Sequence, residues 1–243
     1  MNGLSLFSGA AIGELALKQI IPNYRTVGYV EWDTYCQEVI RARIKDGILD
    51  DAPIFNDIRV FNERFGNLYT GKVDWLSGGF PCQPFSVAGR QLGEADERNM
   101  WPATRDAISI IRPRYAFLEN VAGLLVHEYI HTIFGELAEI GYDCQWDIVG
   151  ADYVGGIHRR RRLWILAHAD GQRCEDTLSG RQEIRQPSGI FTRQAWSGLS
   201  KSSLHRTGDG VASRVDRLKA LGNGWVPQVV ARILQITKQE NIA

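Results

Sequence analysis

Residues 73–86 read Val73-Asp74-Trp75-Leu76-Ser77-Gly78-Gly79-Phe80-Pro81-Cys82-Gln83-Pro84-Phe85-Ser86. The apolar run at 73–76 predicts a buried strand, and the glycines and prolines after it predict a rigid turn without regular structure. Cys82 is therefore expected just past a strand end, where ligands bind and catalytic residues lie in an open α/β sheet. A thiol there is either a nucleophile with a stabilised thiolate or a buried packing residue. The flanking glycines and prolines favour the nucleophile, because a packing cysteine needs no such turn.

Length and composition set the class of protein. The chain has 243 residues, 44% of them apolar, which predicts one large domain, or one domain with a small appendage, around a substantial core. The four cysteines show no C-x-x-C spacing, so neither a metal site nor a disulfide framework is predicted. No stretch has the form of a signal peptide or the length of a membrane span, so we expect a protein of the reducing cytoplasm with no membrane partner.

Charge is distributed unevenly along the chain. The formal net charge is zero, yet residues 155–219 hold thirteen Lys/Arg against six Asp/Glu, including the run Arg159-Arg160-Arg161-Arg162. A basic segment in an otherwise acidic chain is typical of a surface that binds a polyanion such as nucleic acid. A solvated charged surface explains the scattered arginines equally well.

The start of the chain has the pattern of a nucleotide-binding unit. A predicted strand at 4–7 is followed by the turn Ser8-Gly9-Ala10-Ala11-Ile12-Gly13 and a predicted helix at 14–21. A second predicted strand, 26–30, ends in Glu31-Trp32-Asp33, where a carboxylate about twenty residues after the glycines is placed to accept from ribose hydroxyls. Trp32 is interpreted either as a platform for a purine face or as an ordinary core residue.

Two more predicted strands end in carboxylates. The strand at 53–55 leads to Asp57, which either accepts from an adenine amine or caps the helix that follows. The strand at 115–118 leads to Glu119. Helices are predicted at 34–45, 100–111, 129–139, 214–221 and 227–238, strands at 142–149 and 163–167, and a mobile loop beside the active site at 87–98. Residues 169–213 lack apolar periodicity, which indicates a small irregular domain, a segment ordered by a partner, or partial disorder.

Taken together, these motifs resemble the DNA (cytosine-5) methyltransferases of bacteria and phages, in the family's motif order and along nearly the whole chain. The nucleophile motif is similar to 79–86 with Ala88-Gly89, the second catalytic motif to Glu119-Asn120-Val121, and the R-x-R motif to Arg160 and Arg162. The S-adenosylmethionine pocket of the family matches Phe7, Gly9, Ala10, Ala11, Glu31, Trp32, Asp57, Ile58 and Pro81, with Asn223 returning from the C-terminal segment.

The resemblance implies a fold and a division of the chain. The expected fold is a doubly wound, mostly parallel α/β sheet of the Rossmann-like methyltransferase type with a small irregular target-recognition domain. Residues 1–168 would form the catalytic and S-adenosylmethionine-binding domain, 169–213 a short target-recognition domain, and 214–243 a segment that returns to the catalytic domain.

The resemblance also implies a reaction on duplex DNA. Cys82 would add to C6 of a flipped-out cytosine, and the C5 atom would take a methyl group from S-adenosyl-L-methionine. Glu119 would bond N3, while Arg160 and Arg162 would hold the base carbonyl, the phosphate and Glu119. Gln83, Ser86 and Arg98 are expected to touch DNA. A monomer in the cytoplasm of a bacterium or phage-infected host is expected, with or without a cognate restriction endonuclease.

Three departures from the family pattern keep alternatives open. Ala11 replaces a glycine, Ile157-His158 replaces the usual Pro-Gln before the arginines, and Gly224-Trp225 replaces a small residue followed by an apolar one. An RNA cytosine-5 methyltransferase would use the same cysteine chemistry. A non-catalytic DNA-binding relic would keep the motifs but lose cofactor binding. An amine methylase would instead need a polar tetrapeptide with an aromatic residue at 80–83.

Overall fold

A twisted sheet forms the centre of the molecule in the computed structural model, which describes residues 1–81, 99–156, 158–169, 216, 220 and 223–240. Its strand order is β3-β2-β1-β4-β5-β7-β6. The strands are β1 (Asn2–Leu6), β2 (Arg25–Val30), β3 (Ile54–Phe55), β4 (Trp75–Gly79), β5 (Tyr115–Val121), β6 (Asp143–Val149) and β7 (Arg162–His168). The first five strands pair in parallel, whereas β7 pairs antiparallel with both β5 and β6. The predicted doubly wound, mostly parallel sheet is confirmed.

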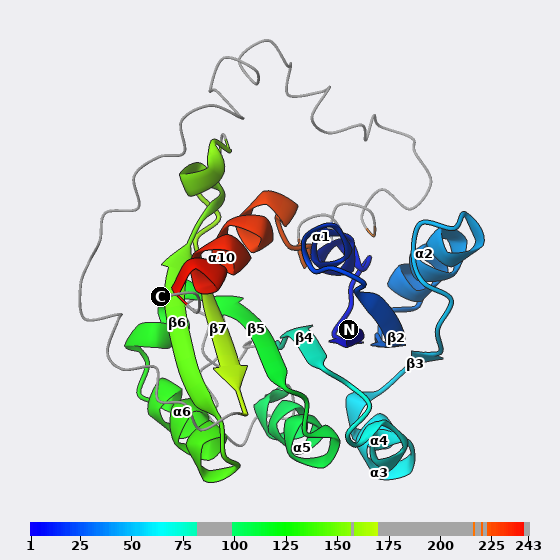
Figure 1. Cartoon of the computed structure of the whole chain (residues 1–243), viewed down its shortest axis with the longest axis horizontal. Coiled ribbons are helices and arrows are strands. Elements are labelled where there is room, and N and C mark those ends of the chain that lie inside the picture. The colour runs from blue at the N-terminus through cyan, green and yellow to red at the C-terminus, as the bar shows by residue number, and fades with distance from the viewer. Residues whose placement is uncertain (82–98, 157, 170–215, 217–219, 221–222, 241–243) are drawn as a thin grey trace.

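Helices cover both faces of this sheet (Figure 1). One layer holds α1 (Ile12–Ile20), α2 (Thr34–Lys45) and α10 (Pro227–Glu240), and α10 packs along α1 although the two are far apart in sequence. The opposite layer holds α3 (Ile58–Arg64), α4 (Gly66–Tyr69), α5 (Trp101–Ile111) and α6 (Tyr129–Glu139). The short helical turns η3 (Ala122–Val126) and η4 (Ala151–Val154) follow β5 and β6. In the described part of the chain, no helix is long and apolar enough to span a membrane.

The core is split by the sheet, because successive strand residues point to opposite faces. On β5, Leu118 is buried against the layer that contains α5 and α6, while its neighbour Phe117 is buried with Trp164 and the α10 residue Val230. Continuous apolar strands of this kind are expected where helices cover both faces.

Most predicted elements are present with ends shifted by one or two residues, and 34–45 and 129–139 match the helices α2 and α6 as predicted. The expectation that regular structure stops before Gly78 is wrong, because β4 continues through Gly79. The glycines here serve close packing rather than a turn. A Cβ on Gly78 would lie 3.2 Å from the Cβ of Leu6, and one on Gly79 would lie 2.9 Å from Oε2 of Glu119. Similarly, β5 extends past Glu119 to Val121.

Several predictions fall on residues that the structure does not describe. They include the loop expected at 87–98 and nearly all of the segment 169–213. Of the helix expected at 214–221, only Asp216 and Ala220 are described, and both are helical.

Candidate active site

Two cavities open at the carboxyl ends of the parallel strands, beside the point where the strand order reverses between β1 and β4. The first has a volume of about 500 Å3 and the second about 380 Å3. Both are lined by Phe7, Trp32 and Pro81, so they are neighbouring lobes of one site. This is the position at which α/β sheets bind nucleotides.

The turn after β1 forms one wall of the first cavity, together with Glu31 at the end of β2. Phe7, Gly9 and Ala11 all have positive φ angles, of 50°, 55° and 54°. Gly9 donates its backbone N–H to Oε2 of Glu31 at 2.6 Å, and Asp33 donates to Oε1 at 2.7 Å. Glu31 is thereby fixed at the strand end. Each carboxylate oxygen has two lone pairs, so it can also accept from a ligand hydroxyl.

The left-handed backbone at Ala11 explains why a glycine suits this position. Ala11 is buried at the N-terminal end of α1, and a non-glycine residue in this region carries a conformational cost of about 1 kcal/mol. Ala10 and Ala11 belong to the turn but line neither cavity, so the cavity wall is formed by their neighbours Phe7, Ser8, Gly9, Ile12 and Gly13.

Trp32 lies at the boundary of the two lobes with 72% of its surface exposed. The interpretation of Trp32 as a core residue is therefore wrong, and its indole face is open to a ligand. Asp57 and Ile58 line the second lobe. Asp57 also caps α3, because its Oδ1 accepts from the backbone N–H of Arg59 at 2.7 Å. The cap predicted as one role for Asp57 is present, and it leaves the residue at the cavity wall.

Glu119 reaches the first lobe from β5 and meets an arginine of β7. Nε of Arg162 donates to Oε1 of Glu119 at 2.8 Å. Burial raises the pKa of Glu119, while Arg162, Arg160 and side-chain hydrogen bonds from Arg162 and Trp225 lower it, and the net shift is upward. Burial and the nearby Arg162 lower the pKa of Arg160, whose Nη2 donates to the carbonyl of Gly224 at 2.9 Å.

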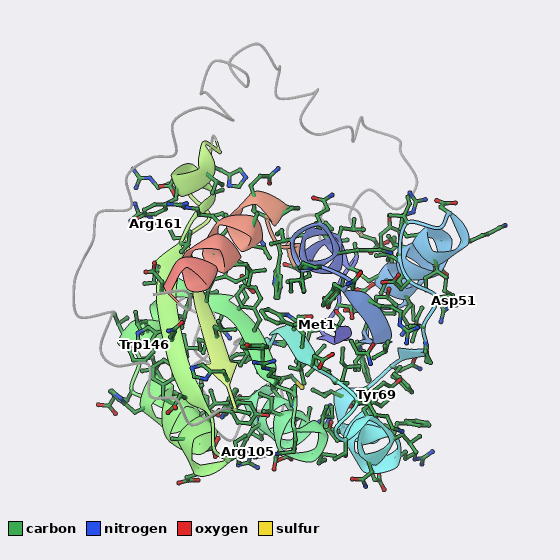
Figure 2. The ribbon with its side chains drawn as sticks, in the orientation of Figure 1. Met1, Asp51, Tyr69, Arg105, Trp146 and Arg161 are labelled. Carbon is green, nitrogen blue, oxygen red and sulfur yellow. The ribbon has the colours of Figure 1, made fainter. Side chains whose placement is uncertain are left out.

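The run of four arginines splits between the cavity and the surface. Arg160 and Arg162 line the first lobe. Arg161 instead lies near η4, as Figure 2 shows, with its guanidinium 5.9 Å from the ring centroid of Tyr153 and 3.5 Å from Oδ2 of Asp152. The R-x-R spacing thus places alternate arginines on the same side of the chain.

Asn120 belongs to the second catalytic motif, but the sequence assigns it no role of its own; in the structure it joins the two catalytic motifs. Its side chain is buried, and its Nδ2 donates to the carbonyl of Phe80 at 3.0 Å. Phe80 packs against Trp101 with the ring centroids 5.4 Å apart. Together these contacts fix the chain up to Pro81. The next residue, Cys82, lies outside the described residues, as do Gln83, Ser86 and Arg98.

Glu14 is a second residue of the site that the sequence did not reveal. It lines the first lobe from α1 and is 4% exposed. Its carboxyl accepts from the hydroxyl of Ser77 at 2.6 Å and from that of Tyr24 at 2.5 Å, and burial raises its pKa. A carboxylate at the start of the helix predicted at 14–21, beside its apolar residues, is the one signal in the sequence that could have identified it.

The C-terminal segment completes the first lobe. Asn223, Gly224 and Trp225 line it just before α10 begins. Trp225 contacts Phe117 and Trp164 edge to face, with centroid distances of 5.4 Å and 5.1 Å. These three residues therefore line the same cavity as Glu31 and Glu119.

A doubly wound sheet with β7 inserted antiparallel between β5 and β6, and a bilobed cavity at its strand ends, defines a Rossmann-like methyltransferase fold. The Dnmt2 methyltransferase of S. pombe shares this fold, with a TM-score of 0.60 over 95% of this chain and 70% of that chain at 18% sequence identity.

Sequence comparison then gives the family. The model of the C-5 cytosine-specific DNA methylases matches residues 1–208, and the chain belongs to this family. The type II methyltransferase M.NgoMIV of Neisseria gonorrhoeae is 40% identical over 169 residues, covering 68% of this chain and 51% of the relative. M.Sau96I of Staphylococcus aureus is 30% identical over 239 residues, covering 95% of this chain and 54% of the relative. The chain therefore spans about half the length of these relatives.

Proposed function

We propose that this chain transfers a methyl group from S-adenosyl-L-methionine to C5 of a cytosine in duplex DNA. The observation that carries the proposal is the position of Glu119. Its largely buried carboxyl, held by Arg162, lines the same lobe as Pro81, the residue that precedes Cys82. Membership of the C-5 cytosine-specific DNA methylase family supports the same activity.

The bilobed cavity fits the cofactor. The exposed indole of Trp32 offers a flat apolar face for adenine, with Asp57 and Ile58 beside it, and the carboxylate of Glu31 offers acceptors for ribose hydroxyls. Phe7 and Pro81 line both lobes, Gly9 and Asn223 line the first, and Ala10 and Ala11 belong to the turn that carries Gly9. When bound, S-adenosylmethionine supplies an electrophilic methyl group on a sulfonium centre.

The protein's own groups would make the C5 atom reactive. The Cys82 thiolate forms a bond to C6, and the displaced electron pair moves into the ring toward N3 and C5. Protonated Glu119 donates to N3 and neutralises that charge, which fits a carboxyl whose burial raises its pKa. Arg162 and Arg160 hold the carboxyl and the base carbonyl through forked donors. After C5 is methylated, a base takes the C5 proton, the electron pair of that bond expels the Cys82 thiolate, and N3 returns its proton to Glu119.

The DNA contacts follow from the same proposal. A stacked cytosine is out of reach, so the nucleotide must be flipped into the first lobe. Gln83, Ser86 and Arg98 would contact the opened duplex, and the basic segment 155–219 would bind phosphates. Residues 169–213 would act as a short target-recognition domain between the catalytic part, 1–168, and the returning segment, 214–243. A monomer of the bacterial or phage-infected cytoplasm is proposed, alone or paired with a restriction endonuclease.

A fluorinated substrate tests this reaction directly. Duplex DNA carrying 5-fluorocytosine at the target, first located by sequencing methylated genomic DNA, is incubated with the protein and S-adenosylmethionine. Since fluorine cannot leave as a cation, the bond from Cys82 to C6 should persist as a denaturation-resistant adduct. The adduct should require cofactor, vanish in Cys82→Ala, and remain in Cys144→Ala, which removes a thiol of β6 that lines neither lobe.

The alternatives predict other outcomes. An RNA methyltransferase would form the adduct with fluorinated RNA and not with DNA. A non-catalytic relic would form none with either nucleic acid. An amine methylase would methylate ordinary DNA yet leave the fluorinated ring unbound, which would overturn the mechanism.

A further inference from the structure

Trp225 lies beside the proposed catalytic acid, Glu119. Hydrogen bonding from the Trp225 indole N–H lowers the pKa of Glu119. The two groups converge over Gly79, because a Cβ built there would lie 2.9 Å from Oε2 of Glu119 and 3.2 Å from Nε1 of Trp225. Arg162 already bonds the other oxygen, Oε1. The carboxyl of Glu119 therefore has a charged donor on one oxygen and a neutral indole donor on the side of the other.

The indole itself is held on several sides. It meets Phe117 at an interplanar angle of 89° and Trp164 at 76°. A Cβ on Gly13 would come within 2.6 Å of its Cε3, so only a glycine at the start of α1 leaves room for this ring. The preceding carbonyl, that of Gly224, accepts from Arg160 at 2.9 Å. An indole ring fixed in this way keeps its N–H pointing in one direction, which a mobile side chain cannot do.

We propose that Trp225 is a positioning residue that sets the orientation and the protonation of Glu119. This proposal rests on the proposed function, in which protonated Glu119 donates to N3 of cytosine. A donor on a carboxyl favours its anion, so the indole N–H works against the effect of burial. With both oxygens oriented by donors of the protein, the acidic proton is confined to the remaining lone pairs of the carboxyl. Trp225 would thus keep Glu119 titratable and aligned.

The proposal is tested by Trp225→Phe, which keeps an aromatic ring and removes the N–H. The matched control is Trp75→Phe. Trp75 belongs to the same aromatic cluster, and its Nε1 has no hydrogen-bond partner among the described residues. In Trp225→Phe the pKa of Glu119 should rise. The alkaline limb of the turnover profile should therefore move to higher pH, with maximal turnover reduced about tenfold. Trp75→Phe should keep the wild-type midpoint and turnover within about twofold.

A second measurement does not depend on activity. The carboxyl carbons of 13C-labelled glutamates are titrated by NMR, with the Glu119 signal assigned by its loss in Glu119→Gln. Its midpoint should move upward in Trp225→Phe and stay in place in Trp75→Phe. An unmoved Glu119 midpoint in Trp225→Phe would show that the indole only packs, and would overturn the proposal whatever the turnover. Failure of the wild-type protein to methylate cytosine at C5 would instead contradict the proposed function, while the NMR titration would still decide the coupling of Trp225 to Glu119.

Discussion

Arg162 and Glu119 form a diagonal ion pair across two antiparallel strands. Arg162 lies opposite Val121 in the register of β5 and β7, and its Nε reaches back two residues to Oε1 of Glu119 at 2.8 Å. The side chains are 27% and 12% exposed, so the pair is largely removed from water. Removal from water raises the pKa of Glu119 and the arginine opposes it. Arg162 can therefore keep the Glu119 carboxyl in position while that carboxyl takes up and releases a proton.

Glu119→Gln should remove proton donation to N3 while keeping the side chain in position. The amide oxygen can still accept from Arg162, but the amide cannot transfer a proton to N3. The rate of methyl transfer in a single turnover should fall by roughly 100-fold, within the range usual for the loss of a general acid. Calorimetry should show wild-type affinity for S-adenosylmethionine. A variant as fast as the wild type would remove Glu119 from the proposed chemistry.

Asn120→Ala should reduce turnover through the chain segment before Cys82. It deletes the donor to the buried Phe80 carbonyl at a cost of about 1–3 kcal/mol and frees the backbone that leads to the proposed nucleophile. We expect turnover to fall at least tenfold, measured at saturating cofactor and DNA. Asn62→Ala is the matched control. Asn62 is also buried, and its side chain donates to the carbonyl of Ala103 over 2.8 Å. Neither residue lines either lobe. Equal losses of stability and of turnover in the two variants would argue against a specific role for Asn120.

Glu31→Ala should weaken cofactor binding while leaving the chemical step nearly unchanged. The variant removes the proposed ribose acceptor and the partner of the Gly9 and Asp33 amides. Because these interactions are alike in ground and transition states, the Kd for S-adenosylmethionine should rise at least tenfold, and turnover at saturation should change less than about threefold. Asp50→Ala is the control, because Asp50 also accepts from a backbone amide of β2, that of Thr26 at 2.9 Å, outside both lobes. Unchanged affinity combined with a large loss of turnover would contradict the assignment.

The fold is predictable because its signals are local. Glycines, prolines and carboxylates at strand ends mark the sheet edge, and apolar runs mark strands that are covered on both faces. The same local signals predict that Glu31, Asp57 and Glu119 lie along one edge of the sheet. They fail at Gly78 and Gly79, where glycine extends β4 instead of ending it. The reason is the close approach of Leu6 and Glu119, a tertiary contact that no local pattern carries.

The site residues that the sequence missed make contacts between distant segments. Glu14 accepts from Ser77, 63 residues away, and Asn120 donates to Phe80, 40 residues away. Trp225 could be noticed only as a departure from the family pattern. Its contact with Glu119 depends on Gly13 and Gly79 both lacking side chains, and such a combination has no signature in a single sequence.

Glu14 leads to a pH-dependent prediction about folding stability. Burial raises its pKa above the ordinary value of 4.5, although the hydroxyls of Ser77 and Tyr24 oppose this shift. A carboxyl whose pKa is higher in the folded state contributes its full stability below pH 4.5, and that contribution is lost as the pH rises through the folded-state pKa. Tyr24 stays protonated throughout, since its own pKa is raised well above 10.

Glu14→Gln removes this titration, while Ser77 and Tyr24 can reorient their hydroxyls to the amide. Near pH 4.5 the wild type should match or exceed the variant in Tm. As the pH rises from 4.5 through the raised pKa of Glu14, the difference in Tm should change in favour of the variant. The change should be about 2–4 °C for each kcal/mol of lost stability in a chain of this size. Calorimetric scans at several pH values measure this, with Glu38→Gln, an exposed carboxyl of α2, as the control that should follow the wild type. A Tm difference between wild type and Glu14→Gln that is constant with pH would show that burial of Glu14 does not affect the pH dependence of folding.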